Sequence, residues 1–235
     1  MAGWVAKRFW KEAAVAEEPG GFAVLLDGRG VRTPAKRPLI LPTRALAEAV
    51  AVEWQAQEGQ VRPETMPVTR SANSALDKVA PQFDEVTEML AAYGGTDLLC
   101  YRATAPEALV ARQAQAWDPV LAWAARRFEA PLETTAGVMH QAQPETSLTR
   151  LADHVRGFSP FQVAGFHDLV AISGSLILGL GVTEGHLLPE EAWELSRLDE
   201  TWQIEQWGAD EEAAEIEAFR RTAFLQAARF YALCG

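Results

Sequence analysis

The segment from residue 159 to residue 181 constrains the fold more than any other part of the chain. Ser159-Pro160 is a helix-start signal, because proline suits the first helical position. The residues that follow are apolar almost all round, and the longest apolar run covers residues 169–182. This run is shorter than the ~20 residues that a membrane span needs. We therefore predict a buried central helix that ends at Gly179 or Gly181, with other helices packed closely against it.

Helical periodicity dominates the whole C-terminal part of the chain. The predicted helices cover residues 106–128, 143–155, 159–181 and 189–208, followed by a last helix that Asp210 caps. Asp118-Pro119 is expected to kink or split the first of them. The last helix carries one apolar line, made of Ile216, Phe219, Ala223, Ala227 and Phe230. Residues 96–102 are expected to form a strand or an irregular buried connector, and residues 132–138 a short strand.

The first forty residues have a β pattern instead. Residues 22–26 predict a strand, and Asp27-Gly28 is a strong hairpin-turn signal. The expected strands are residues 22–26, a returning strand at 31–33, a proline-bracketed edge strand at 38–42 and a further strand within 7–15. A helix capped by Thr43 should run to about Glu58, with Leu46, Val50 and Trp54 along one apolar stripe that covers the sheet. Two more helices are expected at 71–79 and 82–93, broken at Pro81.

These patterns predict an α+β fold in two parts. The composition changes from β- and proline-rich to helix- and alanine-rich between about residues 80 and 95. We expect a small β-rich α+β domain at residues 1–85 and a larger all-helical bundle at residues 86–235.

The predicted helix at residues 189–208 has apolar residues on two sides. At about 100° per residue, Trp193, Ile204 and Trp207 fall on one side, and Leu195, Leu198 and Trp202 fall on the other. Glu200 lies within the first cluster. A carboxylate in such a face needs a hydrogen-bonding or charged partner, in this chain or in another one. Which side faces the core is left open by the sequence.

Catalytic and metal-binding signals are weak. The four histidines have no metal-ligand spacing, and His167-Asp168 is best explained as a polar pair near a helix start. Cys100 has Arg102 nearby, which would lower a thiol pKa, but a lone cysteine between Leu99 and Tyr101 favours a buried structural role. Glu200 and Glu205 lie on different sides of their helix, so they do not predict a catalytic pair. No metal site, nucleotide loop or cofactor is expected.

Charge and cysteine content limit the partners. The net charge of −11 argues against nucleic acid, whose phosphates favour clustered Lys and Arg. The two cysteines, Cys100 and Cys234, do not form a disulfide framework and favour a reducing compartment. Residues 1–8 lack the apolar middle of a secretory signal and are too few for a transit peptide. The sequence predicts a protein that does not insert into membranes.

Several motifs in order along the chain resemble a known family. They are Lys7-Arg8-Phe9-Trp10-Lys11, Leu26-Asp27-Gly28-Arg29, Thr33-Pro34, Leu41-Pro42, Glu53-Trp54, Gln57, Met66-Pro67, residues 96–102, Trp117-Asp118-Pro119, Asp199-Glu200, Gln203, Glu205 and Trp207-Gly208. This ordered set is similar to the assembly chaperones for the α subunit of F1-ATPase, best known from mitochondria. With this resemblance, the absence of a mitochondrial leader implies a bacterial, cytoplasmic member.

The resemblance implies a chaperone rather than an enzyme. Such a protein binds the newly made F1 α subunit and keeps it from aggregating until the β subunit replaces the chaperone. The resemblance places the functional acidic residue at Glu200, with Asp199 and Glu205 as neighbours. We therefore expect the client-binding residues to be Glu200, Asp199, Glu205, Gln203, Trp202 and Trp207. The alternative hypothesis is a small-molecule enzyme that uses Glu200 with His167 or Asp168 in a cleft between the domains.

Overall fold

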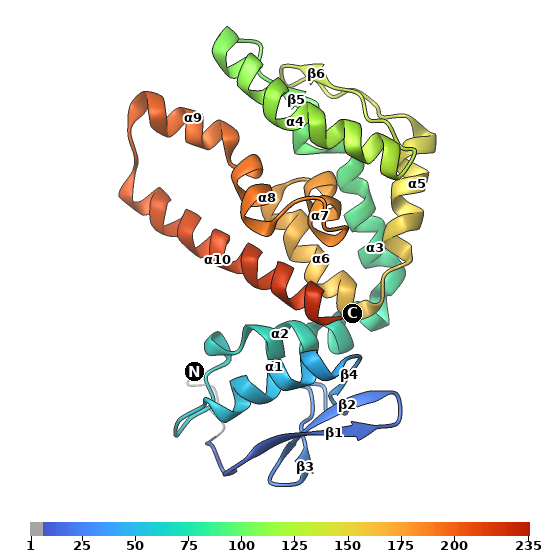
Figure 1. The fold of residues 1–235 in the computed structure, drawn as a ribbon, viewed down its shortest axis with the longest axis vertical. Coiled ribbons are helices and arrows are strands. Elements are labelled where there is room, and N and C mark those ends of the chain that lie inside the picture. The colour runs from blue at the N-terminus through green and yellow to red at the C-terminus, as the bar shows by residue number, and fades with distance from the viewer. Residues whose placement is uncertain (1–6) are drawn as a thin grey trace. The chain divides into compact units, whose positions relative to one another are not determined.

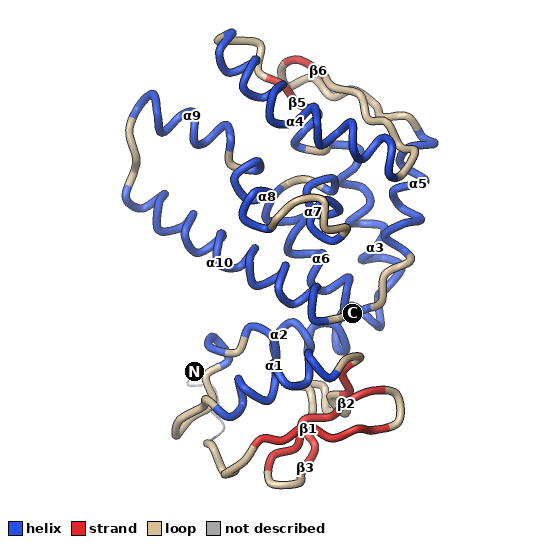
Figure 2. Tube along the Cα trace, viewed as in Figure 1, coloured by secondary structure: helices blue, strands red, loops and turns tan. Residues whose placement is uncertain are grey.

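The computed structural model describes residues 7–235, which form two compact units (Figure 1). Of the described residues, the first unit contains 7–83, 159–165 and 229–235, and the second contains 84–158 and 166–228. The fold is α+β: a small antiparallel sheet near the N-terminus is followed by a chain that is mostly helical, as predicted (Figure 2). No helix in residues 7–235 is both long and apolar enough to cross a membrane.

The elements follow one another in a simple order. In the first part of the chain they are β1 (Ala13–Glu18), β2 (Gly21–Leu26), β3 (Arg29–Gly30), β4 (Ile40–Leu41), α1 (Arg44–Gln55), α2 (Pro67–Ser74) and α3 (Phe83–Ala92). In the second part they are β5 (Tyr101–Arg102), α4 (Glu107–Arg127), β6 (Thr135–Ala136), α5 (Glu145–Arg156), α6 (Pro160–Ser173), α7 (Leu176–Thr183), α8 (Pro189–Ser196), α9 (Leu198–Trp207) and α10 (Glu211–Leu233).

The sheet of the first unit is centred on β2. β1 pairs with it along its length, and β3 and β4 pair with its two ends, all antiparallel. Asp27 and Gly28 both have positive φ, 47° and 83°, which is the hairpin turn that the Asp-Gly pair predicts. α1 packs on the sheet through Leu46 and Val50, both fully buried. The predicted stripe on this helix is therefore confirmed, and Thr43 caps it by accepting from the Leu46 amide.

The predicted strand within residues 7–15 is largely wrong, because β1 begins only at Ala13. The contacts of Arg8 explain why the strand begins later than predicted. Its guanidinium donates to the carbonyls of Trp10, Gln55 and Gln57, which holds the segment against the C-terminal end of α1 instead of in the sheet.

Two motif residues on or just after α1 have structural roles. The Glu53 carboxylate accepts hydrogen bonds from the amides of Val68 and Thr69, both at 2.8 Å, and so caps the start of α2. Gln57 is buried, accepts from the Arg62 amide and donates to the Glu53 carbonyl. Because Glu53 caps the first amides of α2, this helix starts at Pro67, four residues before the predicted Ser71. Pro81 lies in a short 3-10 segment between helical stretches.

The predicted central helix is two helices in the structure. α6 ends at Ser173, Gly174 takes a φ of 72°, and Ser175 caps α7 by accepting from the Leu178 amide. α7 is buried almost throughout, which confirms the expected central position but not the continuity. The break is stabilised by Leu98, whose amide donates to the Gly174 carbonyl at 3.1 Å.

The motif at residues 96–102 forms the support for this break. Asp97 has no exposed surface, and its carboxylate accepts from the Leu99 amide, the Ser175 hydroxyl and the Ile177 amide at 2.8–3.0 Å. The segment is therefore mainly an irregular buried connector, with only β5 as a strand. β5 pairs in parallel with β6, the short strand expected within residues 132–138.

α4 runs through Pro119 as one helix, so of the two expected outcomes at Asp118-Pro119, a kink or a split, the split does not occur. The predicted helix at 189–208, in contrast, is broken at Arg197, whose φ and ψ are −109° and 14°. The Trp117 indole donates to the Leu195 carbonyl at 3.0 Å. In a continuous helix this carbonyl would accept from the Asp199 amide, so the bond from α4 favours the break.

Candidate functional site

α9 is fixed to α4 by two polar contacts. Gln113, itself buried, donates to the Asp199 carboxylate at 2.7 Å. Arg112 makes a two-bond ion pair with Glu205, at 2.6 and 3.0 Å. This pair lowers the pKa of Glu205 and raises that of Arg112. Asp199 and Glu205 are therefore both engaged within the chain, and together they set the position of α9.

Glu200 lies at the surface of the same helix. Its carboxylate is 2.7 Å from the Arg197 guanidinium, and its side chain is 42% exposed. Arg197 is mostly covered and lies over the ring of Trp193, with its guanidinium carbon 5.6 Å from the ring centroid. The charged partner that the sequence required for Glu200 is thus present in this chain, while part of the carboxylate stays accessible.

The aromatic residues of α8 and α9 separate into covered and uncovered groups. Trp193 is 4% exposed, whereas Trp207 is 79% exposed and Ile204 is 42% exposed. The predicted common face of these three residues is therefore wrong, because the break at Arg197 ends the regular helical spacing. Trp202 is half-buried, with the Arg112 guanidinium 5.9 Å from its ring centroid, and Gln203 is exposed.

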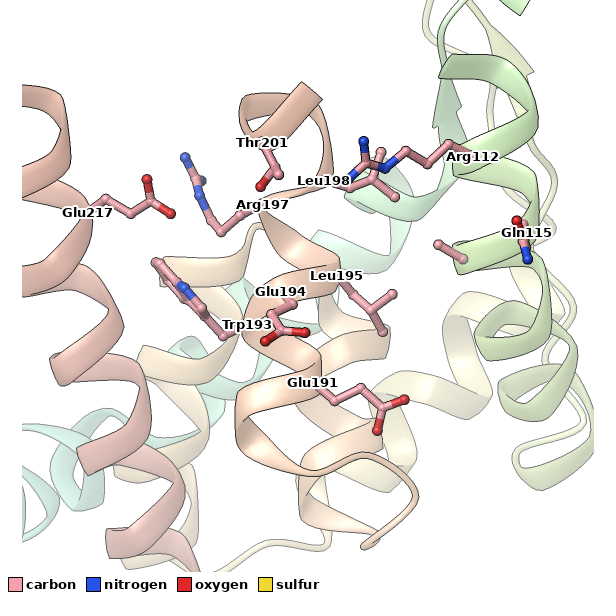
Figure 3. Close-up of a pocket in the computed structure, with 11 residues that line it drawn as sticks. Arg112, Gln115, Glu191, Trp193, Glu194, Leu195, Arg197, Leu198, Thr201 and Glu217 are labelled. Carbon is pink, nitrogen blue, oxygen red and sulfur yellow. The ribbon is translucent and has the colours of Figure 1, made fainter. Parts of the chain in front are cut away.

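A pocket of about 420 Å³ opens beside the break between α8 and α9. Figure 3 shows its lining side chains, which come from α4, α8, α9 and α10 and from the connecting residue Arg197. Among them are Arg112, Glu191, Trp193, Glu194, Arg197 and Glu217. Glu191, Glu194 and Glu217 have no ion-pair partner within residues 7–235.

The other candidate residues do not join this site. His167 and Asp168 contact each other at 2.8 Å on α6, and the only ion-pair partner of Glu200 in the described chain is Arg197. No group of three or more potential metal ligands occurs within residues 7–235. Burial raises the pKa of the Cys100 thiol to about 12, with a further contribution from Asp97. Cys100 is also only 1% exposed, which agrees with the favoured interpretation of a buried thiol.

The sequence interpretation missed three exposed apolar residues near the site. Ile204 was assigned to a face shared with Trp193, and Ile216 and Phe219 to an apolar line on the last helix. In the structure these side chains are 42%, 51% and 76% exposed. The apolar line was a correct signal for an amphipathic helix, but its spacing carries no information about which part of the line is covered.

Comparison with known proteins adds a family and several relatives. Residues 7–125 match the family described as the ATP12 chaperone protein. The mitochondrial protein atp12 of Schizosaccharomyces pombe is 25% identical over 223 residues, which are 90% of this chain and 77% of that protein.

Solved bacterial structures are similar over almost the whole chain. Atp12 from Paracoccus denitrificans is 52% identical, with a TM-score of 0.96 and coverage of 98% of this chain and 99% of that one. An aspartate-to-lysine variant of the Paracoccus protein also has a TM-score of 0.96. A putative chaperone from Agrobacterium tumefaciens is 45% identical, with a TM-score of 0.92 and coverage of 97% and 86%.

Proposed function

The chain belongs to the ATP12 chaperone family, and on that premise we propose that it binds the unassembled α subunit of F1-ATPase and prevents its aggregation during F1 assembly. It is a chaperone and not an enzyme, so the family assignment excludes the alternative enzyme that would use Glu200 with His167 or Asp168. The observation that carries the proposal is the family match, which covers half of the chain and is extended by relatives of the same fold.

The physical basis of this function is the covering of exposed apolar surface. Subunits that have not yet assembled expose large apolar patches, and such patches aggregate unless another surface covers them. Release requires only that the native partner subunit binds more tightly than the chaperone. The proposal therefore needs no nucleotide, cofactor or nucleic acid, and we place the activity in the bacterial cytoplasm. The bacterial origin of the solved relatives supports this location.

Within this proposal the residues of α9 divide into two roles. Asp199 and Glu205 position the helix, because both carboxylates are bound to α4. Glu200, Gln203, Trp202 and Trp207 contact the client. The exposed ring of Trp207 supplies apolar area, and the exposed part of the Glu200 carboxylate supplies charge. Large aromatic side chains of this kind are frequent anchors at protein interfaces.

Co-purification tests the proposed client. The tagged chaperone is mixed with purified F1 α subunit, and the mixture is analysed by gel filtration and by light scattering during dilution of α from denaturant. We expect a stable complex and less scattering. If the wild-type chain neither retains α nor reduces its scattering, the client assignment is wrong.

The variant Glu200→Lys tests the role of α9. The Glu200 carboxylate is 42% exposed although its partner Arg197 is mostly covered, and ion pairs with an exposed member contribute about 1 kcal/mol to stability. We therefore expect a folded protein, by circular dichroism and thermal unfolding, with weaker α binding. Glu88→Lys is the matched control, since Glu88 is exposed on α3 and has no ion pair in the described chain. An unfolded Glu200→Lys protein would show instead that Glu200 is structural.

A further inference from the structure

The apolar line of α10 is covered along only half of its length. Ile216, Phe219, Ala223, Ala227 and Phe230 lie at helical spacing along one side of the helix. Ala227 and Phe230 are 4% and 1% exposed, while Ile216 and Phe219 are 51% and 76% exposed. The covered half is ordinary core packing. The uncovered half is an amphipathic helix face without a partner among residues 7–235, and such faces mark interaction sites.

This uncovered face belongs to a longer exposed segment. Residues 203–222, from the second half of α9 to the middle of α10, are all exposed except Glu217, which is half-buried. We call this segment the arm. In Figure 1 its two helices lead to the linker of residues 208–210, at the end of unit 2 where α9 turns into α10. The arm carries four large exposed apolar residues: Ile204, Trp207, Ile216 and Phe219.

The arm is also strongly acidic. It contains six acidic residues and two basic ones, Arg220 and Arg221, which gives a net charge of −4. Glu205 is paired with Arg112, and Asp210 caps α10 by accepting from the Ala213 amide. Glu211 and Glu212 lie in the first turn of α10, where negative charge stabilises the helix. Glu215 and Glu217 lie beyond that turn and have no ion pair in the described chain, so their charge is available to a partner.

We infer that the arm binds a basic amphipathic segment of the client, with Ile216 and Phe219 against its apolar side and Glu215 and Glu217 near its lysines or arginines. This inference rests on the proposed chaperone function and names the kind of client segment that is recognised. Complementary charge selects the partner and raises the association rate, while burial of the apolar side chains supplies most of the affinity. The pocket beside Trp193 adjoins the arm, because Glu217 belongs to the arm and also lines the pocket.

A second copy of this chain does not fit the arm. The whole chain carries a net charge of −11, and two arms placed against each other would bring together two segments of −4. Like charges at an interface oppose association. The occupant is therefore a chain with the opposite charge.

Paired variants test the apolar part of the arm. Ile216→Ser/Phe219→Ser is compared with Val52→Ser/Met89→Ser, which changes two exposed apolar residues on α1 and α3. Affinity for purified F1 α subunit is measured by surface plasmon resonance. We expect the arm variant to bind roughly tenfold more weakly or worse, because apolar anchors dominate interface energies, and the control to bind like wild type. Equal binding by wild type and the arm variant would overturn the inference. Absence of binding by the wild type itself would instead contradict the proposed function.

Charge variants test the recognition of a basic segment. Glu215→Gln/Glu217→Gln is compared with Glu48→Gln/Glu88→Gln, which changes two exposed glutamates within α1 and α3. We expect the arm variant to bind α a few-fold more weakly at low salt, with the difference shrinking as salt is raised, because screening weakens exposed charge pairs. A difference that is absent at low salt contradicts the charge recognition.

Photo-crosslinking identifies the occupant directly. Benzoylphenylalanine is placed at position 219, with position 52 as the control, and crosslinks to F1 α subunit are mapped by mass spectrometry. We expect position 219 to crosslink to a client segment that contains apolar residues and lysines or arginines. Crosslinks to a net-acidic segment, or only to a second copy of this chain, would overturn the inference.

Discussion

Folded proteins usually bury apolar groups and expose charged ones. Asp97 and the arm both depart from this pattern, Asp97 as a buried charged group and the arm as an exposed apolar surface. Asp97 is a carboxylate with no exposed surface, surrounded by three donors from residues 99, 175 and 177. The arm exposes the apolar side chains of Trp207 and Phe219, which are 79% and 76% accessible. A buried carboxylate is tolerated when it is hydrogen-bonded. Large apolar side chains that stay exposed form a surface that a binding partner can cover.

The difference separates the residues that hold the fold from those that face a partner. Glu53, Gln57 and Asp97 belong to the motifs that resemble the family, and each makes several hydrogen bonds within the chain. Ile216 and Phe219 belong to none of these motifs, and their side chains are exposed. Substitutions at the first group should therefore change stability, and substitutions on the arm should change binding.

The largest effect on stability is expected from Asp97→Ala. It leaves two backbone amides and the Ser175 hydroxyl without their acceptor, and each buried unsatisfied group costs about 1–3 kcal/mol. We expect a loss of at least about 3 kcal/mol in the free energy of unfolding, measured in urea. The control is Asp153→Ala, which removes only a surface pair with Arg156 and should cost about 1 kcal/mol or less. Equal losses of unfolding free energy in the two variants would show that the buried hydrogen bonds of Asp97 contribute no more to stability than a surface ion pair.

The pH dependence of stability tests the same carboxylate. Burial raises the pKa of Asp97 from 3.8 to about 6, although hydrogen bonds from Ile177, Leu99 and Ser175 oppose the shift. Because the folded pKa is the higher one, this contribution to stability is fully present below the unfolded pKa and is lost as pH rises through about 6. Compared with Asp97→Asn, the wild type should lose at most about 3 kcal/mol between pH 4 and pH 7. Urea unfolding at several pH values measures this difference, and a rise with pH would contradict it.

The smallest stability effect is expected on the arm. Ile216→Ser/Phe219→Ser removes side chains that are mostly accessible, so the free energy of unfolding should change by only about 0.5 kcal/mol. Phe224→Ala on the same helix is the contrast, because Phe224 is fully buried next to Trp193 and its truncation should cost about 3–5 kcal/mol. Thermal unfolding of both variants gives the comparison. A strongly destabilised arm variant would mean that the arm is part of the core.

The fold was largely accessible from local sequence patterns. The Asp27-Gly28 turn, the Thr43 cap and the apolar stripe of α1 depend on neighbouring residues only, and all three are present. The α+β class followed from the change of pattern along the chain. Two of the errors have a common physical cause: the unpredicted breaks at Gly174 and Arg197 are stabilised by groups far away in sequence. Leu98 donates to the Gly174 carbonyl, and Trp117 donates to the Leu195 carbonyl.

The candidate site was only partly accessible in this way. The sequence identified Glu200 as a carboxylate that needs a partner, and the motifs identified the family, which the comparison confirms. The partner itself, Arg197, lies three residues earlier, at a spacing that brings side chains together on any helix, so it could have been named from the sequence. The roles of Asp199 and Glu205 depend on Gln113 and Arg112 of α4, about ninety residues away.

By itself the sequence determined the family, the α+β class and the amphipathic character of the last helix, because these depend on residue types and local spacing. Only the tertiary structure decided which half of the apolar line on α10 is buried and which half, at Ile216 and Phe219, stays uncovered. Helical periodicity gives the direction in which a side chain points, but burial depends on whether another element lies in that direction. That information comes from contacts between distant parts of the chain.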